Sequence, residues 1–290
     1  MSETLPSVTA VGAHPVRIAH RFRGPATSSN GGYCAGLMAT HVPAPVVTVR
    51  LLKPPPLERD LVLRPLAGDT SGTLQLVETT NSESSGSERV IAIARASNIQ
   101  LRVPKPISYP EALAASRHFT GRSQHIFPEC FVCGTQRERG DGLRLFAGPL
   151  DSMRVAAPWI PDPSLADEHG KVRTEFLWAA LDCPGYFAAA PDGRVILLGE
   201  MTAQVLRSVP VDESCTVLAW RISVSGRRHE VGTALFDGDH EPCAVAHAWW
   251  IEPRETAADH ELGFTATFEI YPEIALGDPG TIELERVSCR

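Results

Sequence analysis

The chain is poor in lysine and has no long uninterrupted apolar run. Only three of its 27 basic residues are lysines, and its formal net charge is −7. Nucleic-acid binding requires clustered Lys and Arg for phosphate contacts, so this composition argues against it. A membrane-spanning helix needs about 20 consecutive apolar residues. The longest candidate, residues 176–190, is interrupted by Asp182 and Pro184. We therefore expect neither a nucleic-acid nor a membrane partner.

The sequence also lacks a secretion signal of the usual kind and an even set of cysteines. Residues 1–14 are polar and contain no apolar stretch of the signal-peptide type. The seven cysteines are scattered through a chain that is long enough to fold without disulfides. These features favour a reduced, cytoplasmic protein.

Two blocks of sequence recur at a nearly constant spacing. Residues 202–211 repeat the order of Thr, an apolar pair, a base and a proline found at 48–57, an offset of 154. Residues 245–251 resemble 93–99 at an offset of 152. Ordered matches of this kind indicate a duplicated unit. With 290 residues, 43% of them apolar, the chain can form two domains, each with its own core.

Each repeat has the pattern of one helix followed by antiparallel strands. In the first half we expect a helix over 31–41 and strands over 46–53, 61–66, 72–80 and 89–103. In the second half we expect a helix over 174–190 and strands over 195–206, 215–224, 228–236 and 243–251. A short helix over 110–118 and a tail strand over 264–270 complete the set. This pattern predicts an α+β fold in which one continuous sheet wraps two helices.

Short motifs in both halves resemble hotdog-fold acyl-CoA thioesterases of the phenylacetyl-CoA type. Glu129-Cys-Phe-Val-Cys-Gly134, followed by Gly142-Leu-Arg-Leu-Phe146, is similar to the opening of such a domain. Trp178-Ala-Ala-Leu-Asp182 resembles the central helix, and Asn30-Gly-Gly-Tyr33 resembles its His-Gly-Gly start. The resemblance implies a double hotdog, with a first domain over 15–105, a second over 125–255 and a C-terminal extension over 256–290.

The resemblance also implies a site shared between the two halves. In the family, amides at one helix N-terminus hold the developing oxyanion. A carboxylate on the partner helix is the nucleophile or the base for water. The acid follows the second glycine by about seven positions, where the first half has Ala39, whereas the second half keeps the acid as Asp182 and lacks the glycines. One complete site is therefore expected, formed by Asn30, Gly31, Gly32 and Asp182, and the other would be inactive.

Two features depart from the family pattern. Asn30 stands where the family usually has His. A second alignment sets Gly32 and its neighbour Tyr33 on Gly185 and Tyr186, and it would not pair position 39 with Asp182. We prefer the first alignment because the motifs of the second half fix it independently. It requires a shorter helix and connection in the first half.

Three other residues have both a functional and a simpler structural interpretation. Thr202 begins a strand where the family can carry a Ser or Thr that orients the water or the acid, although a β-branched strand residue needs no such role. Cys130 and Cys133, with His125 upstream, have the spacing of half a zinc site. Structural zinc takes four ligands in paired spacing, and no second pair follows. The sequence therefore favours two small buried cysteines and no metal.

The resemblance implies an acyl-CoA thioesterase-like hydrolase that cleaves a thioester to a free acid and coenzyme A without a cofactor. A non-catalytic acyl-CoA-binding hotdog protein, with Asp182 structural, is the alternative. A hotdog dehydratase or hydratase ranks third, because that chemistry typically uses a His with an acid on the central helix. Of the two central helical stretches only the first contains a His, and His41 lies at its end. We expect acyl-CoA as the small-molecule partner and a homodimer of double hotdogs.

Overall fold

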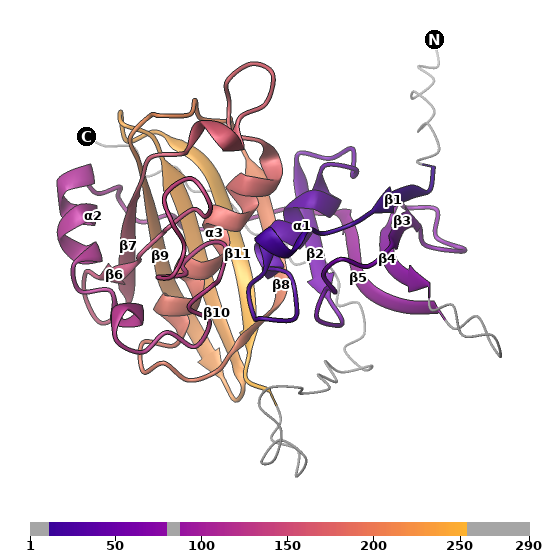
Figure 1. Cartoon of the computed structure of the whole chain (residues 1–290), viewed down its shortest axis with the longest axis horizontal. Coiled ribbons are helices and arrows are strands. Elements are labelled where there is room, and N and C mark those ends of the chain that lie inside the picture. The colour runs from indigo at the N-terminus through magenta and orange to yellow at the C-terminus, as the bar shows by residue number, and fades with distance from the viewer. Residues whose placement is uncertain (1–11, 80–87, 254–290) are drawn as a thin grey trace.

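The computed structural model describes residues 12–79 and 88–253 (Figure 1). These residues form one 11-stranded sheet in the order β1-β3-β4-β5-β2-β8-β11-β10-β9-β7-β6. The strands of the first half are β1 (His14–Val16), β2 (Val46–Leu51), β3 (Leu61–Pro65), β4 (Leu74–Thr79) and β5 (Glu88–Ala96). Those of the second half are β6 (Gly148–Pro149), β7 (Arg154–Trp159), β8 (Leu197–Val205), β9 (Cys215–Ser225), β10 (Arg228–Phe236) and β11 (Pro242–Ile251). The fold is α+β, as the sequence predicts.

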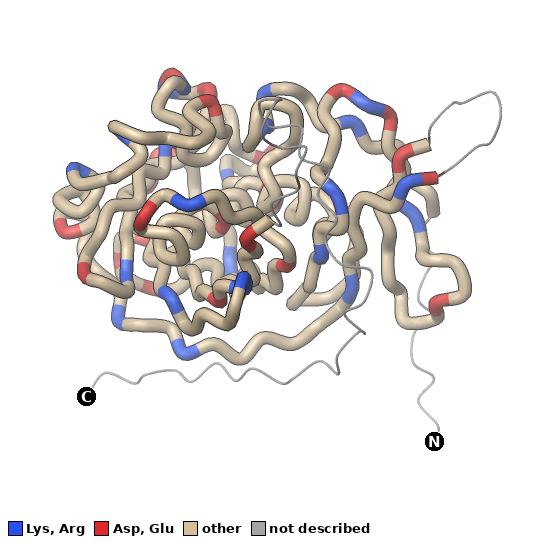
Figure 2. The backbone as a smooth tube through the Cα atoms, turned by 90° about the horizontal axis from the view of Figure 1, so that it is seen from below, with Lys and Arg blue, Asp and Glu red and all other residues tan. Residues whose placement is uncertain are grey.

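The helices are few and short compared with the sheet. They are α1 (Gly31–Ala39), α2 (Tyr109–Ser116) and α3 (Thr174–Ala189), with 3-10 turns η1 (His20–Phe22), η2 (Thr120–Arg122) and η3 (Pro163–Leu165). Within the described ranges, no helix is long and apolar enough to cross a membrane. Figure 2 shows basic and acidic positions interspersed along the backbone rather than gathered into one basic stripe.

Residues that are equivalent in the two sequence repeats occupy equivalent places in the sheet. In the middle of the sheet β2 pairs antiparallel with β8, and Thr48 lies opposite Thr202. Thr48 also lies opposite Arg95 of β5, and Thr202 lies opposite His247 of β11. Outward from this seam, the order β2-β5-β4-β3 on one side matches β8-β11-β10-β9 on the other. The two halves therefore share one continuous sheet and repeat the same strand order.

The two longer helices pack on one face of the sheet and against each other (Figure 1). Every residue of α3 after Glu175 is buried, because the helix is apolar on all sides and lies between the sheet and α1. The opposite face carries a second core cluster, in which Ile99 and Leu101 pack with α2 against Trp220 and Phe236. Alternate residues of the same strands supply the two faces.

Some boundaries differ from the sequence prediction. The strand expected over 89–103 ends at Ala96, after which the Ser97 amide still donates to the Val46 carbonyl. Ile99 and Leu101 keep the apolar alternation because they fill the second core cluster, not because the ladder continues. β1, β6 and β7 were not predicted, since the first two are very short and β7 contains Pro158. The expected tail strand over 264–270 and the extension over 256–290 lie outside the described residues.

Candidate active site

The N-terminus of α1 meets the middle of α3 at Asp182. The Gly32 amide donates to Asp182 Oδ2 over 2.9 Å, and the Asn30 side-chain amide donates to the same oxygen over 2.7 Å. Asn30 also caps α1, because its Oδ1 accepts a hydrogen bond from the Tyr33 amide at 2.9 Å. Three of the residues singled out in the sequence, Asn30, Gly32 and Asp182, are thus in direct contact.

Glycines allow this close contact between the two helices. A Cβ on Gly32 would lie 2.5 Å from Asp182 Cβ, and one on Gly36 would lie 2.6 Å from Trp178 Cβ and 2.7 Å from Glu175 Cα. Both positions therefore need glycine so that the helix backbones can approach. The family resemblance implied that the Gly32 amide would hold an oxyanion, whereas in the structure Asp182 and Trp178 of α3 occupy the space beside Gly32. Gly36 was missed, although its spacing of four residues from Gly32 places both on one helix face.

Burial dominates the electrostatics of Asp182. The residue is only 3% exposed, and desolvation raises the pKa of its carboxyl to about 7, against the opposing hydrogen bonds from Gly32 and Asn30. Among the described residues, no group donates a hydrogen bond to its second oxygen, Oδ1. A carboxyl that ionises near neutral pH, with one oxygen unpaired, is suited to accept a proton.

Gly31 and Thr202 are the other two site residues that the sequence predicts. Gly31 is the first residue of α1, where helix amides lack internal acceptors, and within the described ranges nothing accepts a hydrogen bond from its N–H. Thr202 lies at the seam of the sheet, where its hydroxyl is 2.7 Å from the hydroxyl of Thr48. The structure therefore gives Thr202 a hydrogen-bond partner other than the Asp182 carboxylate.

The opposite end of the helix pair carries no equivalent acid on α1. The contacts of Gly32 with Asp182 and of Gly36 with Glu175 show that α1 runs antiparallel to α3. Ala39, the last residue of α1, therefore extends toward the start of α3. With nine residues against 16 in α3, α1 is the shorter helix that the preferred alignment requires.

Three cysteines lie beside Asp182, a feature that the sequence did not reveal. The sulfur of Cys183 is 3.6 Å from the Asn30 side-chain nitrogen and 3.6 Å from the sulfur of Cys130. Cys133 completes the group, in which all three sulfurs are within 4.8 Å of one another. No spacing rule joins Cys183 to the Cys130-x-x-Cys133 motif, because only the docking of the loop on α3 unites them.

No family model matches the chain. Short stretches match curated trigger factors, at 33% identity over 81 residues for Methylibium petroleiphilum and 34% over 79 residues for Paraburkholderia phymatum. These matches cover 28% and 27% of this chain but only 19% and 18% of those proteins. They are therefore too short to indicate the fold or the function of the whole chain.

Two solved structures superpose on most of the chain. The tesB protein of Mycobacterium avium subspecies paratuberculosis is 12% identical, with a TM-score of 0.54, over 86% of this chain and 95% of that one. A protein described as a thioesterase II, from Thermobifida fusca, is 15% identical, with a TM-score of 0.52, over 84% and 93%. The likeness at such low identity concerns the fold alone, and it confirms the fold that the motif resemblance implied. The chain has the fold of the hotdog thioesterases.

Proposed function

We propose that the chain is a double hotdog, in which two helix-plus-sheet units over 15–105 and 125–255 are fused. The matched strand orders on the two sides of the β2–β8 seam support this arrangement. So does the register, because the repeat partners Thr48 and Thr202 lie directly opposite each other. Such pairing is expected when two copies of one unit meet about a twofold axis.

We further propose that the protein hydrolyses an acyl-CoA thioester at Asp182. The observation that carries this proposal is the contact between the Asp182 carboxylate of one half and the helix N-terminus of the other. As a base, Asp182 would take a proton from water, and the resulting hydroxide would add to the thioester carbonyl carbon. The C–S bond then breaks, and the thiolate of coenzyme A recovers the proton, which leaves a free acid and a thiol.

The Gly31 amide is the group that could hold the oxyanion. It lies at the positive end of α1 and is not engaged by any acceptor among the residues described. The Gly32 amide, by contrast, is already bound to the carboxylate at 2.9 Å. An oxyanion beside Asp182 would therefore be stabilised by Gly31 first, and by Gly32 only if the carboxylate releases it.

A second candidate is a non-catalytic acyl-CoA-binding protein. The burial of Asp182 and its two hydrogen bonds to α1 favour this reading, because they are what a purely structural carboxylate would show. In that case the acid would fix α1 on α3, and acyl-CoA would bind without turnover. Acyl-CoA as the ligand, the homodimer and the cytoplasmic location stay predictions in both cases.

Thiol release from a panel of acyl-CoAs of different chain lengths tests the proposed function. Asp182→Asn should lower kcat by about 10²–10⁴-fold, because it removes the charge that accepts the proton and preserves the shape. Glu175→Gln is the matched control, since it alters an acid on the same helix at the opposite end of the pair. It should retain the wild-type rate.

The panel also separates the two candidates. If the wild-type protein binds acyl-CoA but hydrolyses none of the chain lengths, the protein is an acyl-CoA-binding protein and not an enzyme. Turnover that survives in Asp182→Asn, with circular dichroism matching the wild type, would show that the site lies elsewhere.

A further inference from the structure

Three cysteine sulfurs converge in the core next to the candidate site. Cys130 and Cys133 belong to the loop between η2 and β6, and Cys183 belongs to α3. None of the three is more than 7% exposed. Their sulfurs come from two separate parts of the fold and yet lie within 4.8 Å of one another. Together the three sulfurs are placed to act as soft ligands of a single metal ion.

The spacing of the sulfurs fits a single tetrahedral ion. A Zn–S distance of about 2.3 Å places two sulfurs of a tetrahedral site about 3.8 Å apart, and those of Cys130 and Cys183 are 3.6 Å apart. Thiolate ligands select zinc among the common divalent ions that prefer tetrahedral geometry. We propose that Cys130, Cys133 and Cys183 bind one zinc ion.

The loop that carries two of these ligands turns its backbone amides toward one sulfur. The backbone amides of Val132 and Cys133 both donate to the Cys130 sulfur. The loop closes through the Gly134 amide, which donates to the Cys130 carbonyl over 2.9 Å. Only glycine fits there, because a Cβ would lie 2.4 Å from that carbonyl oxygen.

The three sulfurs leave the fourth position of a tetrahedral site to a ligand from outside the chain. The Asp182 carboxylate lies nearby, since the side-chain nitrogen of Asn30 contacts both Asp182 Oδ2, at 2.7 Å, and the Cys183 sulfur, at 3.6 Å. The group of ligand atoms within 4.8 Å of one another nevertheless consists of the three sulfurs and does not include Asp182. Zinc sites with three protein ligands keep their fourth position for water or substrate.

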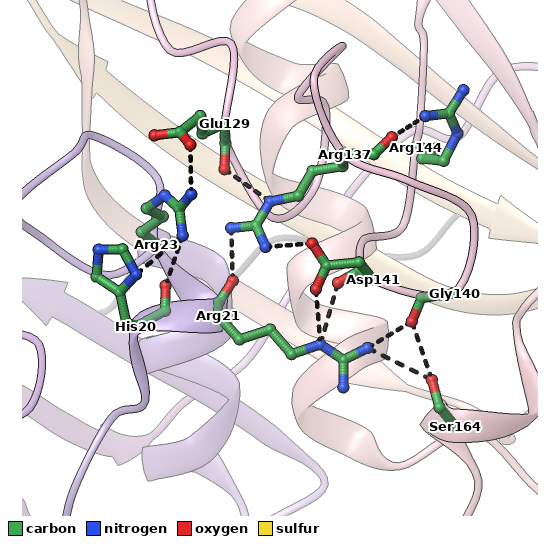
Figure 3. Close-up of polar contacts among 9 residues, drawn as sticks. All are labelled: His20, Arg21, Arg23, Glu129, Arg137, Gly140, Asp141, Arg144 and Ser164. Carbon is green, nitrogen blue, oxygen red and sulfur yellow. Dashed lines mark hydrogen bonds and ion pairs between the residues drawn. The ribbon is translucent and has the colours of Figure 1, made fainter.

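The ligand loop is anchored without the ion (Figure 3). The buried Arg137 guanidinium donates to the Glu129 carbonyl at 2.8 Å, the Arg21 carbonyl at 2.7 Å and the Asp141 carboxylate at 2.8 Å. Arg23 adds an ion pair with the Glu129 side chain at 2.7 Å. Because this network positions Cys130 and Cys133, we expect the metal-free protein to remain folded and zinc to stabilise it further.

Metal analysis of the full chain tests the proposal. The reduced protein, stripped with a chelator and then titrated with zinc, should bind one equivalent and unfold at a higher temperature. Cobalt(II) in place of zinc should give the thiolate-to-cobalt charge-transfer absorption of a tetrahedral sulfur site. Cys130→Ala, Cys133→Ala and Cys183→Ala should each remove that absorption or lower the affinity at least tenfold. Cys34→Ala is the matched control, since Cys34 is equally buried in α1 but outside the group.

A second measurement needs no variant. Bound zinc should slow the reaction of Cys130, Cys133 and Cys183 with a thiol reagent in the wild-type protein, compared with the same protein without metal. No stoichiometric binding and no charge-transfer band would overturn the proposal, as would equal loss in Cys34→Ala. These readouts use no substrate, so their result is independent of whether the protein hydrolyses acyl-CoA.

Discussion

A carboxylate as buried as Asp182 is tolerated because α1 supplies its partners. Two donors, the Gly32 amide and the Asn30 side chain, bind one of its oxygens, and the positive end of the helix dipole adds to their effect. Without them the charged form would be far more costly to bury. The position of α1 on α3 is therefore what allows an acid to be buried in the core, and the glycines of α1 set that position.

The first prediction compares two adjacent glycines. Gly32→Ala should lower the free energy of unfolding by about 1–3 kcal/mol, because its Cβ would lie 2.5 Å from Asp182 Cβ and 2.8 Å from the Trp178 carbonyl oxygen. In Gly31→Ala the nearest atoms are terminal methyl groups of Leu51 and Leu198 at 3.0 Å, which can move. That variant should cost much less.

Urea unfolding of both variants measures the difference. Since both substitutions replace glycine by alanine in the first turn of the same helix, intrinsic helix propensity largely cancels between them. Equal stability of the two variants would contradict the conclusion that Gly32 serves the contact between the helices.

The second prediction concerns the strands β2 and β8, which join the halves. Thr48 and Thr202 are both buried, and their hydroxyls are 2.7 Å apart. Thr202→Val should cost about 1–3 kcal/mol of stability, because it leaves the Thr48 hydroxyl buried without its partner. The double variant Thr48→Val with Thr202→Val should be more stable than that single variant, since neither hydroxyl then remains.

A double-mutant cycle by urea unfolding gives the coupling energy. The same variants test the role that the family resemblance implied for Thr202. If the hydroxyl orients the acid or the water, Thr202→Val should also slow thioester hydrolysis. The geometry instead predicts an unchanged rate, and a large loss of kcat in a stable variant would contradict it.

The longer elements were predictable from the sequence because their patterns are local. Alternation and turn residues place β8 to β11 within a few residues of their observed bounds, and the repeat offset equates Thr202 with Thr48, which the structure places opposite each other. Contacts between distant elements were not predictable in the same way. Cys183 joins the other two cysteines only through tertiary packing. Ile99 and Leu101 alternate as strand residues do, but they lie beyond the end of β5 and are buried in the second core cluster.

At the scale of the whole molecule, several separate contacts hold the halves together. β2 pairs with β8, α1 packs on α3, and Arg137 of the second half binds the Arg21 carbonyl of the first. The chain passes from β5 to α2 through residues 97–108, in which Arg102 and Lys105 are not buried. The halves therefore depend on each other through side chains and ladder bonds as well as through the covalent connection.

The third prediction follows from that dependence. Residues 1–104 and 105–290, expressed as separate chains in one cell, should associate and co-purify as a one-to-one complex. Each half alone should aggregate, because it would expose β2 or β8 as an unpaired edge and the apolar face of α1 or α3. Affinity capture of one tagged half, followed by size-exclusion chromatography, measures the association.

Gly36→Val should weaken the association of the halves, since a Cβ there would lie 2.6 Å from Trp178 Cβ, whereas Gly12→Val, in open space, should not. Two halves that each form stable monomers and do not associate would show that neither the seam nor the contact of Asp182 with α1 is needed for folding.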